Sequence, residues 1–121
     1  MPRESQRKNK IAAEIQRIVN ELLLGEVKDP RLARVSVSAV EVSGDLGVAT
    51  VYFSTLSLDD DPSAVREGFE KARGFIRSRV GEALQLRRVP ELRFRYDTSA
   101  RRGVEIGRLI DEGGATNRPR D

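Results

Sequence analysis

The chain has 121 residues, 22 Lys and Arg against 19 Asp and Glu for a formal net charge of +3, and neither Cys nor His. This length fits one domain, and the missing residue types exclude disulfides, thiolate or imidazole metal ligands and histidine-based catalysis, so we expect no cofactor and no metal. No apolar run could cross a membrane, and the basic first residues precede an amphipathic segment rather than a signal region, so we expect a cytoplasmic protein without a membrane partner.

The N-terminal part of the chain predicts a short flexible segment and then an amphipathic helix. Residues 1–6 show no apolar periodicity, so we expect them to be flexible. From about residue 7 to residue 24 apolar side chains recur at helical spacing, with Ser5 as the candidate cap and Gly25 as the stop. The first half of this helix is basic and includes Lys8 and Lys10.

Two runs rich in β-branched residues follow and predict a β-hairpin. In the first run, residues 34–42, apolar residues alternate up to Ala39 and change parity at Val40, which indicates a bulge or burial on both faces. A turn cluster at residues 43–47 leads into the second run, residues 48–56. Because the connection is short, we expect the two strands to pair antiparallel.

The acidic segment Asp59-Asp60-Asp61-Pro62-Ser63 predicts the start of a helix. It supplies capping acids, a proline for the first turn and negative charge at the positive end of the helix dipole. A metal site built from the three aspartates is the alternative. Adjacent side chains that enter a helix do not converge on one point, which favours the capping role.

Residues 65–88 carry the pattern around which we expect the domain to be organised. Apolar residues recur there at steps of three and four, which indicates a helical face, and basic residues flank that face. Gly74 and Gly81 lie inside the pattern, where a glycine indicates a kink or a close approach by another backbone. We predict two helices that meet at a bend near Ala72 and Gly74, end near Arg88 and present cations to an anionic partner. The alternative is one curved helix whose arginines are only solvated.

The third predicted strand covers residues 91–97. Its apolar residues take one face, and Arg93 and Arg95 take the other. It should extend the hairpin, with its apolar side under the helices and its arginines on the open face. With this strand the elements make a two-layer α+β domain, in which helices cover one face of a three-stranded sheet.

The C-terminal part of the chain predicts a short helix and a tail. Thr98 or Ser99 can cap a helix that runs to about Glu112, where two glycines end it. Residues 113–121 are expected to be a disordered tail. The predicted folded domain therefore covers residues 7–112.

Charge is unevenly distributed along the chain. Residues 71–102 hold ten Lys and Arg against three acids, whereas residues 41–61 hold five acids and no base. Of the 22 basic residues 18 are Arg, whose planar guanidinium suits phosphate and stacks on bases. A small domain with such a basic cluster has the electrostatic character of a nucleic-acid-binding protein.

Three stretches carry motifs whose order and spacing are more informative together than singly. They are VSAVEVSGDLGVATVY at residues 37–52, ARGFIR at residues 72–77 and LRRVPELRFRYDTS at residues 86–99. Together they resemble the ribosome-binding factor A family over roughly residues 7–111. The predicted order of elements also resembles the type II KH RNA-binding fold.

The resemblance implies a non-catalytic assembly factor of the bacterial small ribosomal subunit. Proteins of this family bind the free or immature 30S subunit and its 16S rRNA, promote rRNA maturation and late subunit biogenesis, and support growth in the cold. We therefore expect a monomer whose partners are the 30S subunit and 16S rRNA. Ribosomal proteins and other assembly factors are further candidate partners.

The resemblance also implies where RNA contacts lie. In this family an Ala-x-Gly helix kink replaces the GxxG loop of ordinary KH domains, and Ala72 and Gly74 take that place here. A GxxG loop binds the RNA backbone through free amides, so a kinked helix pair depends more on side-chain cations. The expected contacts are Lys8, Lys10, Lys71, Arg73, Arg77, Arg79, Arg87, Arg88, Arg101 and Arg102.

Three other functions are alternatives to this one. A nuclease that trims rRNA is disfavoured, since the sequence has no P-loop, no Rossmann glycine pattern and no carboxylate set spaced for two metals. A protein-binding adaptor would use the acidic hairpin to meet a basic ribosomal protein. A generic KH-like RNA-binding module would bind every RNA-containing particle equally.

Overall fold

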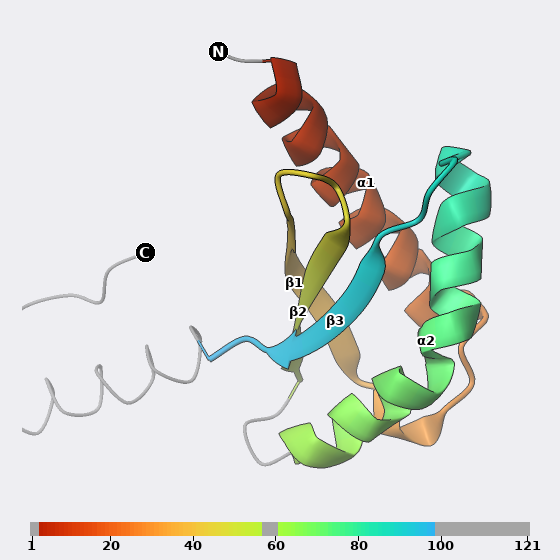
Figure 1. The fold of residues 1–121 in the computed structure, drawn as a ribbon. Coiled ribbons are helices and arrows are strands. Elements are labelled where there is room, and N and C mark those ends of the chain that lie inside the picture. Colours follow the sequence, from red (N-terminus) through yellow and green to blue (C-terminus); the bar gives the residue numbers. More distant parts are fainter. Residues whose placement is uncertain (1–2, 57–60, 99–121) are drawn as a thin grey trace, which may run out of the picture.

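The structure, a computed structural model, describes residues 3–56 and 61–98 of the chain. These residues form two layers, in which two α-helices cover one face of a three-stranded sheet (Figure 1). This arrangement confirms the predicted α+β class, whereas the predicted last helix and tail lie outside the described residues. In chain order the elements are α1 (Arg3–Gly25), the 3-10 helix η1 (Pro30–Leu32), β1 (Val35–Val42), β2 (Val48–Thr55), α2 (Pro62–Leu84) and β3 (Glu91–Tyr96).

The sheet has β2 at its centre, with β1 on one side and β3 on the other. β1 pairs antiparallel with β2, and the register shifts between Val37 and Ala39, which confirms the predicted hairpin and its bulge. β3 pairs parallel with β2, so that Glu91 lies opposite Val48. A parallel pair needs a long crossover connection, and α2 supplies it on the helical side of the sheet.

α1 begins earlier than the sequence predicted. It starts at Arg3 rather than Arg7, because the residues between them include no glycine or proline and the helical backbone extends through them. The segment expected to be flexible, residues 1–6, therefore overlaps the first turn of α1. Ser5 lies inside the helix, so its predicted role as the cap is wrong, whereas Gly25 ends the helix as predicted.

α2 begins where the sequence predicted and continues as one helix. The Asp61 carboxylate caps its first turn by accepting a hydrogen bond from the Ser63 N–H at 3.0 Å. The helix runs without interruption through Gly74, so the predicted pair of helices is corrected to one. A glycine lowers helix stability by roughly 1 kcal/mol but keeps its N–H, and the backbone hydrogen bonds can persist. Figure 1 shows that the first turns of α2 nevertheless run at an angle to the rest.

α2 ends at Leu84, earlier than predicted. The next residue, Gln85, takes a left-handed conformation with φ 52° and ψ 42°. This turn of the chain lets the Leu86 N–H donate a hydrogen bond to the Gly81 carbonyl oxygen at 3.2 Å. The result is a Schellman motif, which satisfies carbonyl groups that the helix end leaves free.

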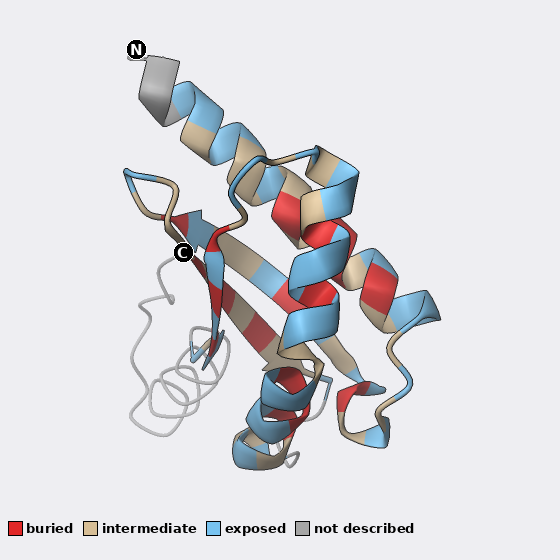
Figure 2. Ribbon diagram, turned by 45° about the vertical axis from the view of Figure 1, so that its right-hand side comes forward, coloured by how far each residue is buried: buried red, intermediate tan, exposed pale blue. Residues whose placement is uncertain are grey.

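The hydrophobic core lies between the helices and the sheet (Figure 2). Phe69 of α2 packs on Phe53 of β2 and Phe94 of β3, with ring centroids 5.1 Å and 4.6 Å apart. Val80 is fully buried on α2, and Leu92 is fully buried on β3, which confirms the predicted apolar faces of both elements. Each side chain of this size stabilises the fold by about 1.5–3 kcal/mol when buried, so the orientation of α2 on the sheet is well determined.

Candidate nucleic-acid interface

Arg73, a predicted phosphate contact on α2, lies partly inside the molecule. Its side chain is 36% exposed and forms an ion pair with Glu70 on the preceding turn. Its guanidinium carbon lies 6.0 Å from the centre of the Phe94 ring, a cation–π contact. Its Nε is buried and has no hydrogen-bond partner among the described residues. Arg73 is therefore only partly exposed, because its side chain folds back over the edge of the core.

Arg77, another predicted contact, is exposed, but its guanidinium already binds backbone atoms. Its Nη2 donates a hydrogen bond to the Val89 carbonyl oxygen at 2.8 Å, and its Nε donates to the Pro90 carbonyl oxygen at 3.1 Å. Pro90 is fully buried where the chain enters β3, and carbonyl groups near the interior need such partners. Arg77 therefore has a structural role that the helical pattern alone did not reveal.

Arg79 is also engaged within the protein. It forms an ion pair at 2.9 Å with Glu26, which lies just after α1. Its guanidinium carbon lies 4.9 Å from the centre of the Phe75 ring. Arg79 thus joins α2 to the segment after α1 and also covers an aromatic ring on the helix surface.

Lys71 differs from these arginines because it is exposed and has no hydrogen bond or ion pair within the described part of the chain. It lines a shallow hollow of about 320 Å³ between α2 and the segment after α1. Ala72, half-buried, and Phe75 line the same hollow. Gly74 is exposed next to them. The predicted Ala-x-Gly motif therefore lies at an open surface beside an available cation.

A second basic surface lies where α1, the hairpin turn and the loop before β3 meet. Arg87 and Arg88 lie in that loop rather than at the end of a helix, and both are exposed. With Arg7 of α1 they line a groove of about 210 Å³, whose apolar lining includes Ile11 and Leu46. The fold thus brings three arginines together from two distant parts of the sequence.

One acid, Asp45, lies among these arginines. The Ser43 hydroxyl donates a hydrogen bond to its carboxylate at 2.7 Å and the Gly47 N–H donates another at 2.9 Å, and these bonds lower the pKa of Asp45. The carboxylate is therefore held by the hairpin turn, in which Leu46 has a positive φ of 62°. A single acid neutralises only part of the charge of three arginines.

The other predicted contacts are divided between α1 and the end of the chain. Lys10 is exposed and Lys8 is half-buried on α1, and neither has an ion pair with a described residue. Arg7 precedes them and was not predicted as a contact, although its place in the same basic run could have identified it. Arg101 and Arg102 lie outside the described residues.

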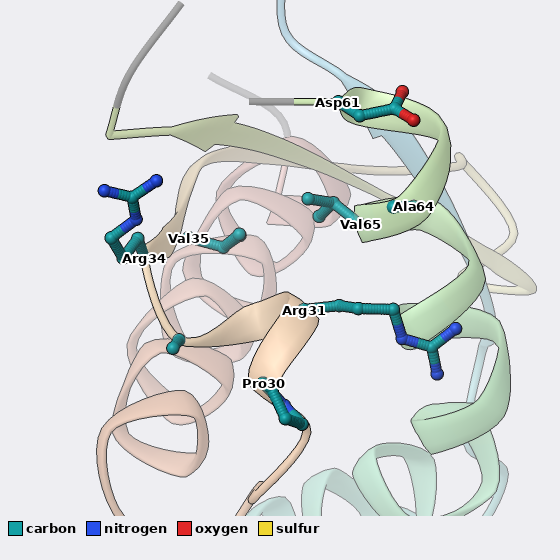
Figure 3. A pocket seen from close by; sticks show the side chains of 8 residues that line it. Pro30, Arg31, Arg34, Val35, Asp61, Ala64 and Val65 are labelled. Atoms are coloured by element: carbon teal, nitrogen blue, oxygen red, sulfur yellow. The ribbon is translucent and has the colours of Figure 1, made fainter. Parts of the chain in front are cut away.

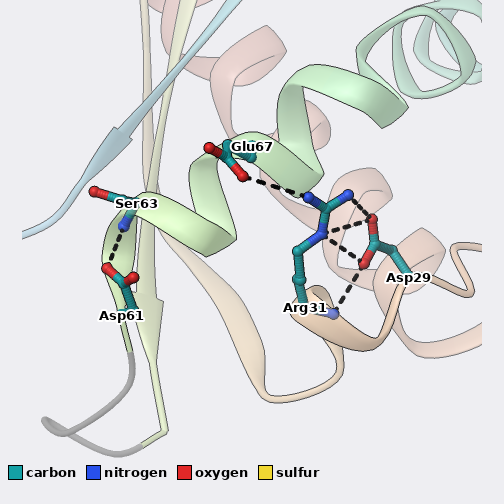
Figure 4. A network of polar contacts seen from close by, with 5 residues as sticks. All are labelled: Asp29, Arg31, Asp61, Ser63 and Glu67. Carbon is teal, nitrogen blue, oxygen red and sulfur yellow. Dashed lines mark hydrogen bonds and ion pairs between the residues drawn. The ribbon is translucent and has the colours of Figure 1, made fainter.

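A further hollow, of about 290 Å³, lies between η1 and the first turn of α2 (Figure 3). The charged side chains at this position are held by structural contacts. The Arg31 guanidinium lies between Asp29, at 2.7 Å, and Glu67 of α2, at 3.6 Å (Figure 4). The guanidinium and N–H of Arg31 lower the pKa of Asp29 to about 2. This network connects η1 to α2.

The described residues contain no group of three or more acidic side chains that could hold a metal ion. Of the three aspartates weighed as a metal site, Asp61 caps α2, and the other two lie outside the described residues. Within the same ranges, neither helix is long and apolar enough to pass through a membrane.

The fold and these surfaces define a small α+β domain that presents basic side chains along one helix and around a groove. The chain belongs to the ribosome-binding factor A family, whose sequence model matches residues 7–110. It is 42% identical to ribosome-binding factor A of Nitrosospira multiformis over 118 residues, covering 98% of this chain and 94% of that protein. It is 43% identical to ribosome-binding factor A of Chromohalobacter salexigens, covering 96% of this chain and 90% of that protein. These matches confirm the resemblance seen in the sequence motifs.

Solved structures show the same fold. The crystal structure of ribosome-binding factor A from Thermus thermophilus has a TM-score of 0.66 at 25% identity, covering 74% of this chain and 94% of that one. The solution structure of a Thermotoga maritima protein described as a putative ribosome binding factor A has a TM-score of 0.65 at 36% identity, covering 74% and 85%. A Thermus thermophilus homology model fitted into a map of a 30S complex has a TM-score of 0.64 at 24% identity, covering 77% and 98%.

Proposed function

We propose that this protein binds the 30S ribosomal subunit through phosphates of 16S rRNA and acts without catalysis in late subunit maturation. The observation that carries the proposal is the contrast among the basic residues. Arg77 and Arg79 bind other groups of the same chain, through hydrogen bonds and an ion pair respectively. By contrast, Lys71 and the groove arginines Arg87 and Arg88 have no hydrogen bond or ion pair within the described part of the chain. Available cations are what the binding of a phosphate backbone requires.

The ribosomal target rests on the family and on the Thermus thermophilus homology model, which was fitted into the map of a 30S complex. The same proposal includes four further properties. The protein would promote rRNA maturation and growth in the cold, and it would be a cytoplasmic monomer. Any effect on rRNA processing would then be indirect, through the shape that the bound precursor RNA adopts.

The proposal is tested by co-sedimentation with free small subunits, large subunits and joined ribosomes, at low and at moderate salt. Binding confined to free small subunits and weakened by salt is expected, because each neutralised phosphate releases counterions. Equal binding to every RNA-containing fraction would instead show a generic RNA-binding domain, and affinity that does not change with salt would exclude phosphate contacts.

Charge reversal locates the contact surfaces. Lys71→Glu and the double variant Arg87→Glu with Arg88→Glu are each expected to weaken binding without loss of folding, because these side chains make no internal ion pair. Arg95→Glu on the open face of the sheet is the matched control for the change of charge. If this control weakens binding as much as the two test variants do, the proposed surfaces are wrong. Arg77→Glu is unsuitable because it also removes the hydrogen bonds to the loop before β3.

A further inference from the structure

Phe75 is an exception among the four phenylalanines of the chain. Phe53, Phe69 and Phe94 are buried and pack ring against ring in the core, whereas 40% of Phe75 is exposed on α2. Placing a large aromatic side chain in water forgoes the free energy that its burial would contribute. An aromatic ring that is kept partly exposed in this way is available for a contact outside the chain.

The Phe75 ring is held in place by its neighbours. The guanidinium of Arg79 lies 4.9 Å from the ring centre, and Glu26 fixes that guanidinium through an ion pair at 2.9 Å. A ring with a fixed orientation loses little conformational freedom when a ligand stacks on it. The arrangement therefore fixes the orientation of the ring, and the 40% of Phe75 that stays exposed is available to a ligand.

The surface beside the ring is open and flanked by cations. A Cβ atom added at Gly74 would have no neighbour within 4 Å, so a ligand can approach the backbone of α2 there. The hollow of about 320 Å³ that Phe75 lines also has Lys28 and Lys71 along it, and neither lysine has an ion pair with a described residue. The two acids of the hollow, Glu26 and Asp29, are paired with arginines.

We propose that Phe75 stacks against an unpaired base of single-stranded RNA, while Lys28 and Lys71 contact the adjacent phosphates. Bases in single strands are recognised by stacking on aromatic rings beside a basic groove, which is the combination found here. The lysines favour RNA over an apolar protein segment, which would leave both cations without partners. The inference rests on the proposed function, since it assigns a role at the same helix surface.

The test compares the affinity of full-length variants for free small subunits and for a short single-stranded oligoadenylate. Phe75→Ala is expected to weaken both interactions about 5- to 150-fold, the range that loss of one base–aromatic stack produces. Phe75→Tyr keeps the ring and should bind as the unmodified protein does. Phe75→Leu keeps an apolar side chain without a ring and should weaken binding as Phe75→Ala does. If Phe75→Leu binds as tightly as the unmodified protein, the contact is apolar packing, typical of a protein partner, and stacking is excluded.

A fluorescent variant provides a second measurement. The chain has no tryptophan, so Phe75→Trp places one reporter at the proposed stacking position. Oligoadenylate should quench its emission in a saturable way, whereas an RNA duplex of the same length should quench it much less. Leu56→Trp, at a position that is 78% exposed outside the hollow, is the matched control and should not respond. Equal quenching at both positions would overturn the proposal.

The two proposals can fail separately. Unchanged affinity of Phe75→Ala for small subunits that the unmodified protein binds would exclude the stack and leave the proposed function intact. Quenching of Phe75→Trp by oligoadenylate, without any binding of the protein to small subunits, would support the stack and overturn the ribosomal target.

Discussion

The Nη2 atom of Arg77 lies 2.8 Å from the carbonyl oxygen of Val89, and this contact connects the outer surface of α2 to the loop before β3. The loop must turn the chain from the helix into the sheet, and Pro90 is fully buried at the entry to β3. The carbonyl groups of Val89 and Pro90 lie beside this buried side chain and need hydrogen-bond donors. Arg77 supplies two of these hydrogen bonds from one side chain.

Arg77→Ala should therefore lower the free energy of unfolding. We expect a loss of about 1–2 kcal/mol, because hydrogen bonds from a charged group contribute more than neutral ones but these are partly exposed to water. Urea unfolding measures the change as a lower midpoint at constant slope. Arg66→Ala is the matched control, since Arg66 is exposed on α2 and has no partner among the described residues. Equal midpoints for the two variants would contradict the role given to Arg77.

The two glycines of α2 should respond to alanine in opposite directions. Gly74 faces open space, so Gly74→Ala is expected to stabilise the fold by up to about 1 kcal/mol through helix propensity. A Cβ at Gly81 would lie 2.7 Å from Cγ2 of Val89, so Gly81→Ala must displace that side chain and is expected to destabilise the fold by about 1 kcal/mol. Thermal unfolding of both variants shows whether each change raises or lowers stability. Stabilisation by Gly81→Ala would show that the Val89 side chain can move away freely.

The elements of the fold were predictable because their signals are local. The alternation of residues 91–97 and the acids before Pro62 report on near neighbours in the chain, and both predictions are confirmed. The end of α2 was missed because the sequence offers no glycine at Gln85, where the structure nevertheless takes a left-handed turn. The parallel pairing of β3 also depends on how α2 crosses the sheet, which the strand's own sequence does not encode.

The candidate site was less predictable than the fold. A basic residue on a helix surface has the same sequence pattern whether it is solvated, as Lys71 is, or bound to a distant backbone, as Arg77 is. The groove that joins Arg7 to Arg87 and Arg88 depends on the tertiary approach of α1 to the loop before β3. Phe75 falls outside the apolar face predicted for α2, and its position beside Arg79 and the hollow depends on the tertiary structure.

The left-handed conformation of Gln85 leads to a prediction about stability. A non-glycine residue in that region costs about 1–2 kcal/mol, and the exposed Gln85 side chain has no hydrogen bond or ion pair within the described part of the chain. Gln85→Gly should therefore raise the free energy of unfolding by about 1 kcal/mol, after the greater freedom of glycine in the unfolded chain is subtracted. Gln85→Ala, which keeps a Cβ, should give no gain in the same thermal unfolding measurement. If Gln85→Ala were also more stable than the unmodified protein, the gain would come from relief of side-chain strain and not from the backbone conformation.

The stability of the fold should also depend on pH, through the carboxylate of Asp29. Hydrogen bonds from the side chain and N–H of Arg31 lower the pKa of Asp29 from 3.8 to about 2, so the folded state favours the ionised form more than the unfolded chain does. This stabilisation is complete above pH 3.8 and is lost as the pH falls through about 2. Because the Arg31 side chain is 35% exposed, we discount the contribution for solvent screening to about 1 kcal/mol.

Asp29→Asn should remove that contribution. The variant should be less stable than the unmodified protein at neutral pH, and the two should converge as the pH falls from 3.8 to about 2. Urea unfolding at a series of pH values measures both effects. Glu67→Gln is the control at the other side of Arg31, where a carboxylate that is 76% exposed and 3.6 Å away should contribute little. If the difference in the free energy of unfolding between Asp29→Asn and the unmodified protein instead stays constant down to about pH 2, the carboxylate of Asp29 is not the source of the pH dependence.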